Sequence, residues 1–150
     1  MNELNDKTFG KHTAERYHDI SCGHRVVGHE SKCRYLHGHN YRIHFVCEAE
    51  GLDSIGRVID FSVIKEKLCL WIEENFDHKF LLWQSDPFLE SLWLLSPESI
   101  CIVPFNPTAE NMAEYLVKEI APKQLEGTGV ILTKCIIEET RKCSATYEIA

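Results

Sequence analysis

The sequence lacks any long apolar run, and this absence excludes two broad classes of protein. No stretch is long and apolar enough to span a bilayer. The N-terminal stretch MNELNDKTFGKHTAER is polar and mixed in charge, without the apolar centre of a secretory signal. We therefore expect a cytoplasmic protein. The 150 residues, 44% of them hydrophobic, suit a single domain over 1–150, in which the polar residues 1–12 could be disordered.

Closely spaced cysteine pairs are missing as well. A closed structural zinc site needs pairs of the C-x2-4-C type, and none occurs. Without a secretory signal, free thiols are the default state, so a disulfide framework is not expected. Most of the cysteines should be small buried side chains. The seven are Cys22, Cys33, Cys47, Cys69, Cys101, Cys135 and Cys143.

Positive charge is scarce over most of the chain. The formal net charge of −7 argues against bulk nucleic-acid or membrane binding. The segment from Lys11 to His44 is different, because its six Lys and Arg residues and three Asp and Glu residues make it +3, which leaves −10 for the remainder. A basic patch on an acidic protein suits a small anionic ligand, although scattered surface charge explains the same numbers.

The hydrophobic periodicity predicts the order strand, strand, helix, helix, strand, strand. The segment 37–49 alternates between an apolar and a mostly polar face, as a half-buried strand does. Asp60 and Thr108 are expected to cap the two helices. The expected elements are strands over 17–24, 37–49, 129–139 and 143–149, helices over 61–76 and 106–120, and irregular structure with a short helix over 79–107. This order predicts the α+β class, with an antiparallel sheet and helices on one face.

His37 and His39 form a His-Gly-His triplet at the start of the second expected strand. Residues i and i+2 of a strand project from one face, so the two imidazoles can share one metal ion. Their parity places them on the core-facing side and places His44 on the other side. A structural hydrogen-bonding pair is the alternative explanation of such a triplet.

A third ligand has to come from another segment. His24 is the best candidate, because it shares a face with Ile20 on the first strand, which should pair antiparallel with the second. His29, in a loop, and His18, farther down the strand, are weaker candidates. Three neutral imidazoles with a free fourth position are typical of catalytic zinc.

Cys33 lies four residues before His37 and is flanked by Lys32 and Arg34. Neighbouring cations and a metal lower the pKa of a thiol and make it a competent base or nucleophile. A lone cysteine is more often inert, so the hypothesis of a reactive thiol depends on the neighbouring cations and the nearby histidines.

Five short motifs together resemble one known family. They are GHRV…KCRYLHGHNYRI, GRVIDF, FDHKFLL, NPTAENMA and CIIEET, in this order over roughly 20–140. The set resembles the 6-pyruvoyltetrahydropterin synthase superfamily. The C-x3-H-G-H spacing resembles that of the bacterial 6-carboxytetrahydropterin synthases of queuosine biosynthesis more than that of the pyruvoyl-forming enzymes, which have a longer gap.

The resemblance implies a fold, an assembly and a reaction. The fold would be the tunnelling fold, with a four-stranded antiparallel sheet backed by two helices in ββααββ order. Three subunits would close a barrel, and two barrels would stack into a homo-hexamer. The enzyme would be a zinc-dependent lyase that converts 7,8-dihydroneopterin triphosphate to 6-carboxy-5,6,7,8-tetrahydropterin and releases acetaldehyde and triphosphate. The pyruvoyl-forming reaction and a non-catalytic zinc-stabilised module remain as alternatives.

The resemblance also implies roles for single residues. His24, His37 and His39 match the zinc ligands, and Cys33 matches the catalytic thiol. Asp77 and His78 match an Asp-His pair that works with this thiol, although FDH alone could be an ordinary helix terminus. Glu139 matches the glutamate that holds the pterin ring, with Glu138 as the adjacent alternative. Thr108 and Glu110 resemble residues of the pocket wall.

The sequence departs from the family pattern in two places. The segment from Leu81 to Phe105 is longer than in compact members, and it could shape the pocket or the oligomer. The first-strand motif ISCGH has small residues at Cys22 and Gly23, so its packing should survive.

Overall fold

The fold is built on one six-stranded mixed sheet. The structure is a computed structural model that describes residues 10–150. The strand order is β4-β3-β1-β2-β5-β6. The strands are β1 Ala14–His24, β2 His37–Ala49, β3 Phe80–Trp83, β4 Ile100–Val103, β5 Val130–Glu138 and β6 Ser144–Glu148. The expectation of disorder over 1–12 falls mainly on residues 1–9, which lie outside the described residues.

The expected four-stranded antiparallel sheet is wrong in its number of strands and in their directions, because the sheet has six strands and includes parallel pairs. The four expected strands are present as antiparallel neighbours, β1 with β2, β2 with β5 and β5 with β6. Two further strands come from the segment 79–107, where β3 runs parallel to both β1 and β4. Their sequences, FLLW and ICIV, are uniformly apolar and only four residues long, so they carry no period-two signal.

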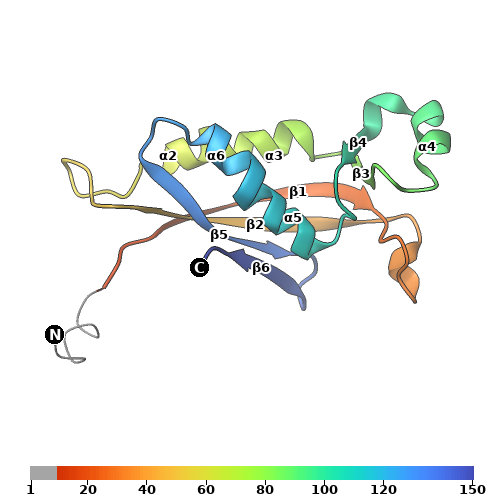
Figure 1. The fold of residues 1–150 in the computed structure, drawn as a ribbon, viewed down its shortest axis with the longest axis horizontal. Coiled ribbons are helices and arrows are strands. Elements are labelled where there is room, and N and C mark those ends of the chain that lie inside the picture. The colour runs from red at the N-terminus through yellow and green to blue at the C-terminus, as the bar shows by residue number, and fades with distance from the viewer. Residues whose placement is uncertain (1–9) are drawn as a thin grey trace.

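The helices cover one face of the sheet. Figure 1 shows α2, α3, α5 and α6 lying along the same side of the long strands. The Asp60 and Thr108 side chains cap the two long helices by accepting from the N–H groups of Ser62 and Asn111, as predicted. Within residues 10–150, no helix is long and apolar enough to cross a membrane. The helical segments are α2 Phe61–Ile64, α3 Leu70–Asn75, α4 Leu89–Leu95, α5 Ala109–Tyr115 and α6 Ala121–Gln124, with π-helical turns at Lys65–Cys69 and Leu116–Ile120 and 3-10 turns at Lys32–Arg34 and Pro97–Ser99.

The core lies between the helices and one face of β1 and β2. Tyr41, Ile43 and Phe45 on β2 are fully buried, and they alternate with more exposed residues as the sequence predicted. At Gly23 on β1, a Cβ atom would lie 2.3 Å from the Phe80 ring, so only glycine lets β3 approach this end of the sheet. The same core face continues to the strand ends, where the histidines lie.

Candidate metal centre

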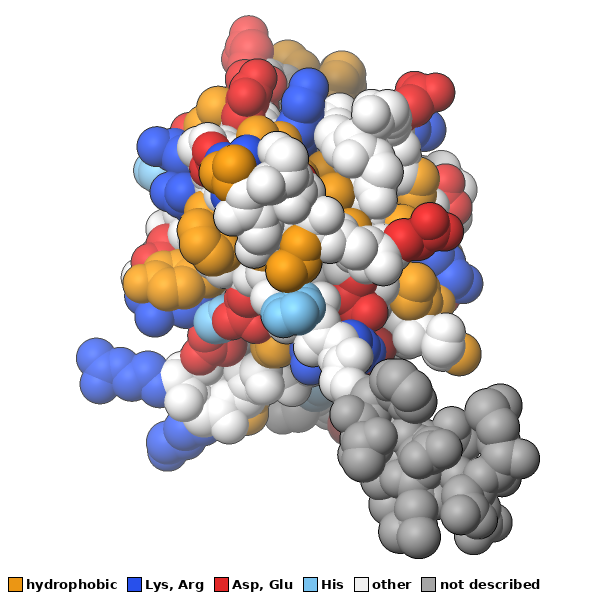
Figure 2. All heavy atoms as spheres, turned by 90° about the vertical axis from the view of Figure 1, so that its left-hand side faces the viewer, with side chains coloured by type: hydrophobic (Ala, Val, Ile, Leu, Met, Phe, Trp, Pro, Cys, Tyr) orange, Lys and Arg blue, Asp and Glu red, His pale blue; other side chains and the backbone are white. Residues whose placement is uncertain are grey.

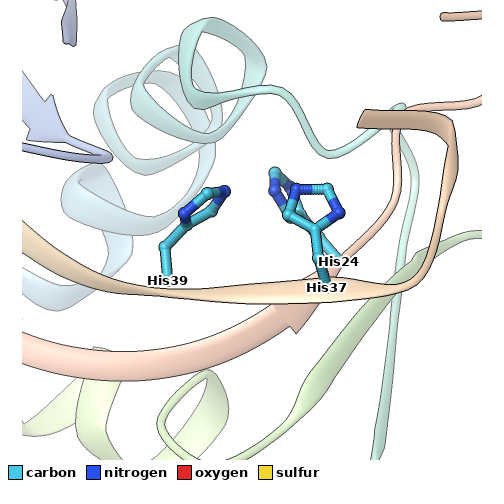
Figure 3. A group of neighbouring side chains, drawn as sticks. All are labelled: His24, His37 and His39. Carbon is cyan, nitrogen blue, oxygen red and sulfur yellow. The ribbon is translucent and has the colours of Figure 1, made fainter. Parts of the chain in front are cut away.

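Three histidines come together where β1 ends and β2 begins. His24 and His37 are directly paired across the two strands, and His39 lies two residues farther along β2. Figure 3 shows the three imidazoles on the same side of these strands. One ring nitrogen from each lies within 4.8 Å of the others, a spacing that could hold a metal ion. The structure therefore groups the three histidines that the strand parity selected.

Backbone carbonyl groups orient two of the three rings. Nδ1 of His24 donates to the Pro107 carbonyl oxygen at 2.6 Å, and Nδ1 of His37 donates to that of Tyr35 at 2.7 Å. A donating Nδ1 leaves Nε2 as the nitrogen with a free lone pair, and metal-binding histidines are usually held in this way. Nε2 of His37 and of His39 are buried without a hydrogen-bond partner in the described part of the chain. Orphaned buried nitrogens that converge on one point fit a metal ion.

Burial favours the uncharged form of two of the imidazoles, those of His24 and His39. His24 is 1% exposed, and burial lowers its pKa to about 4, against a smaller opposing effect of its hydrogen bond to Pro107 and with further lowering by His37 and His39. Burial also lowers the pKa of His39. Neutral imidazole is the form that binds metals, so burial keeps His24 and His39 in the form that can act as a ligand.

Glu139 and Tyr41 complete the surroundings of the cluster. Oε1 of Glu139 lies 3.3 Å from Nε2 of His24 and 3.5 Å from Nε2 of His39. The Tyr41 hydroxyl donates to Nε2 of His24 at 3.2 Å. The sequence reasoning did not name Tyr41 as a site residue, although it shares the strand face of His39 and its position was therefore readable.

Glu138, the last residue of β5, and Glu139, which follows it, contact different groups. Oε2 of Glu138 is 2.5 Å from Nε2 of His44, away from the three histidines. The backbone N–H of Glu139 donates to the Cys143 carbonyl oxygen in the turn between β5 and β6. Of the two glutamates, only Glu139 contacts the histidine cluster.

The other histidines lie outside this cluster. His44 contacts Glu15 and Glu138, as its opposite parity required. His18 lies 3.4 Å from Glu73, and His29 accepts from a backbone N–H in its own loop. Neither weaker candidate for the third ligand approaches the centre.

Cys33 lies in the helical turn that precedes β2. Its side chain is half-buried, and its carbonyl oxygen accepts from the backbone N–H of Val26 at 2.8 Å. Burial raises the pKa of the Tyr41 hydroxyl, and the acidic groups of Cys22, Glu139 and Cys33 raise it further. All seven cysteines are free, which confirms the expectation of thiols.

Asp77 and His78 contact each other but not the histidine cluster. Oδ2 of Asp77 is 2.9 Å from Nδ1 of His78, and Oδ1 accepts from the Ser21 backbone N–H at 2.8 Å. Burial alone would raise the pKa of Asp77, but these two hydrogen bonds outweigh it and lower the pKa. The His78 side chain is 82% exposed and has a positive φ of 58°. Among residues 10–150, no hydrogen bond or ion pair joins His78 to His24, His37 or His39.

His78 lines a hollow of about 510 Å³ at this end of the sheet, together with Ser21, Gly23 and Asn40 and also with His39 of the histidine cluster. Figure 2 shows the opposite end of the molecule, away from the histidines, where basic, acidic and apolar side chains are intermixed. The expected basic segment is also partly neutralised, because Arg42 makes two hydrogen bonds to Asp19 and Arg25 is buried.

The two expected pocket-wall residues lie near the loop that orients His24. Thr108 follows Pro107 and caps α5, and Glu110 is exposed in the first turn of this helix. The side chain of Asn106, which the sequence reasoning did not single out, accepts from the Val27 N–H at 3.0 Å and donates to the Val27 carbonyl at 2.9 Å. This pair of bonds fixes the loop against the end of β1.

Comparisons with known proteins agree with this geometry. The family model described as 6-pyruvoyl tetrahydropterin synthase matches residues 13–150. A Rickettsia bellii protein named 6-carboxy-5,6,7,8-tetrahydropterin synthase is 37% identical over 126 residues, which cover 83% of this chain and 91% of that protein. The chain therefore belongs to the 6-pyruvoyl tetrahydropterin synthase family of pterin synthases.

Solved structures share the fold. The crystal structure of an uncharacterized protein from Wolinella succinogenes superposes with a TM-score of 0.84 at 23% identity, covering 95% of this chain and all of that chain. The Caenorhabditis elegans 6-pyruvoyl tetrahydropterin synthase superposes with a TM-score of 0.67 at 24% identity, covering 95% and 98%. At these identities the likeness shows the fold alone.

Proposed function

We propose that this protein is a zinc-dependent 6-carboxytetrahydropterin synthase acting in queuosine biosynthesis. It would convert 7,8-dihydroneopterin triphosphate to 6-carboxy-5,6,7,8-tetrahydropterin, acetaldehyde and triphosphate. The observation that carries the proposal is the convergence of three imidazoles beside the Glu139 carboxylate. The name of the Rickettsia relative and the short gap between Cys33 and His37 support the carboxy product over the pyruvoyl product.

The metal is the first element of the proposal. His24, His37 and His39 would hold Zn²⁺ through their Nε2 atoms, because the Nδ1 atoms of His24 and His37 already donate to carbonyl groups. Bound zinc supplies a Lewis acid that polarises a carbonyl or hydroxyl oxygen of the substrate. Three protein ligands leave coordination positions for that oxygen.

Glu139 and Cys33 are the second element. The Glu139 carboxylate can accept two N–H bonds from the amino-pyrimidinone edge of a pterin, which would hold the ring beside the histidines. The Cys33 Sγ, as thiolate, would remove a proton from the substrate side chain. Thr108 and Glu110 would shape the wall of the pocket.

Asp77 and His78 are the third element. Asp77 orients the His78 ring, and the imidazole would return a proton to the face of the substrate opposite to Cys33. Because the His78 side chain is 82% exposed and forms no hydrogen bond or ion pair with the three histidines of the described chain, we propose that it acts in the site of another copy of the chain. This arrangement requires a homo-oligomer, and the family resemblance implies a hexamer of two trimers.

Product analysis tests the proposal. Zinc-loaded protein is incubated with 7,8-dihydroneopterin triphosphate, acetaldehyde is trapped, and pterins are identified by mass spectrometry. Acetaldehyde with 6-carboxytetrahydropterin is the expected result. A pyruvoyl product without acetaldehyde would assign the chain to the other branch, and a zinc-loaded protein without turnover would favour the non-catalytic module. The matched variants are His39→Ala, expected to be inactive, and His44→Ala, expected to be active.

A further inference from the structure

A buried ion pair joins the end of β1 to the segment between β3 and β4. Arg25 directly follows His24, and its Nε donates to Oδ2 of Asp86 at 2.7 Å. The Asp86 side chain is fully buried and that of Arg25 is 10% exposed. Burying two charges is costly unless all their polar groups are satisfied, so a pair this deep calls for a specific explanation.

The pair is closely packed on the side of Asp86. Oδ1 of Asp86 accepts from the Phe88 backbone N–H at 2.8 Å, and the Arg25 guanidinium lies 3.8 Å from the centre of the Phe88 ring. The turn itself is tied to β3, because the Asp86 N–H donates to the Trp83 carbonyl oxygen at 2.9 Å. By contrast, α4, which follows in the same segment, buries none of its residues. The buried contact that this part of the segment makes is therefore the ion pair between Asp86 and Arg25.

On its other side, Arg25 reaches the turn that carries Cys33. Nη1 of Arg25 donates to the Arg34 carbonyl oxygen at 2.9 Å. The backbone N–H of Val26, the next residue, donates to the Cys33 carbonyl oxygen at 2.8 Å. The turn Lys32–Arg34 has no buried residue of its own. Hydrogen bonds to two consecutive carbonyl groups, rather than side-chain packing, thus hold the backbone of Cys33 in place.

We propose that Asp86 is a positioning residue for the Cys33 thiol. Asp86 fixes the Arg25 side chain, Arg25 fixes the Arg34 carbonyl group, and the turn then presents Cys33 at a set distance from the three histidines. The inference rests on the proposed function in one respect, which is that Cys33 is the reacting thiol. It assigns a task to the longer segment between β3 and β4, which carries Asp86 and Phe88.

The test combines kinetics with a direct measurement on Cys33. Asp86→Asn keeps the shape of the side chain and leaves Arg25 without its counter-charge. We expect this variant to retain zinc, to keep KM within about twofold of wild type and to lose about 10- to 100-fold in kcat, because a reacting group is misplaced. The rate of Cys33 carbamidomethylation by iodoacetamide, read peptide by peptide with exposed Cys143 as internal reference, should change several-fold.

Two controls separate positioning from general destabilisation. Glu114→Gln breaks the exposed ion pair with Lys118 and should change neither measurement. Ile64→Ala removes a fully buried side chain from α2 and should lower the melting temperature without changing the alkylation rate of Cys33. An Asp86→Asn protein that melts earlier but keeps the wild-type kcat, or that loses kcat while Cys33 alkylates normally, would overturn the proposal.

A second variant covers the case in which Asp86→Asn does not fold. Phe88→Leu removes the ring beneath the guanidinium and leaves no charge unpaired, so a smaller change of the same direction in kcat and Cys33 alkylation is expected. Unchanged values of both in Phe88→Leu, with Asp86→Asn unfolded, would contradict positioning. If wild type does not turn over the pterin substrate, the proposed function fails, whereas the alkylation comparison still decides the role of Asp86.

Discussion

The imidazole of His24 is hydrogen-bonded to the carbonyl oxygen of Pro107, a residue 83 positions farther along the chain. This contact links the end of β1 to the loop that starts α5, and it determines which ring nitrogen faces the other two histidines. Asn106 holds the same loop through two bonds to Val27. The geometry of the histidine cluster therefore depends on a loop that contributes none of the three histidines.

Asn106→Ala should weaken metal binding while leaving the three histidines in place. Loss of both bonds to Val27 frees the Pro107 carbonyl group, and loss of such outer contacts typically costs about 10- to 100-fold in metal affinity. Competition with a zinc chelator measures the change. Asn75→Ala removes a side-chain bond to Trp71 in a helix and serves as the control. Equal affinities of the two variants would show that the loop does not orient His24.

Cys33→Ala should abolish turnover without loss of zinc. The thiol is absent from the histidine cluster, so the metal content should equal that of wild type, whereas removal of a general base lowers the rate by at least about 100-fold. Metal analysis and steady-state kinetics give the two values. Cys143→Ala, at an exposed free cysteine, should behave as wild type. Full activity of Cys33→Ala would remove this residue from the mechanism.

Two inactive variants should complement each other when they assemble together. If His78 acts in the site of a neighbouring copy, co-expressed Cys33→Ala and His78→Ala chains form some sites with both intact residues. Random mixing in a symmetric assembly predicts about a quarter of the wild-type rate. Each variant alone should be inactive. A mixture as inactive as its parts would place His78 in the site of its own chain.

Gly23→Ala should destabilise the protein through the contact between β1 and β3. The new methyl group would lie 2.3 Å from the Phe80 ring, so the ring or β3 has to move, at a cost of about 1 to 3 kcal/mol in the free energy of unfolding. Gly51→Ala is the matched control, since nothing lies within 4 Å of its Cβ position. Thermal melts compare the two, and equal melting temperatures would contradict the close approach.

The sequence predicted the grouping of the three histidines better than the sheet that carries them. The alternation over 37–49 set the bounds of β2, and the parity of His37 and His39 then placed both rings on the core face. His24 followed because an antiparallel partner brings the end of β1 opposite the start of β2.

The remaining differences have physical causes. The strands β3 and β4 are too short to show a period, and parallel pairing joins residues that no local pattern connects. Arg25 reads as a surface charge until Asp86, 61 residues away, is known to be its partner. The placement of His78 depends on the turn between α3 and β3, where this residue has a positive φ of 58°.

The number and coordination of bound metal ions test the central claim most directly. Purified protein is loaded with zinc, dialysed and analysed for metal per chain, and X-ray absorption spectroscopy then reports the ligands. The account predicts one zinc ion per chain with three imidazole nitrogens, and its loss in His39→Ala but not in His44→Ala. Protein without tightly bound metal, or zinc retained in His39→Ala, would contradict it.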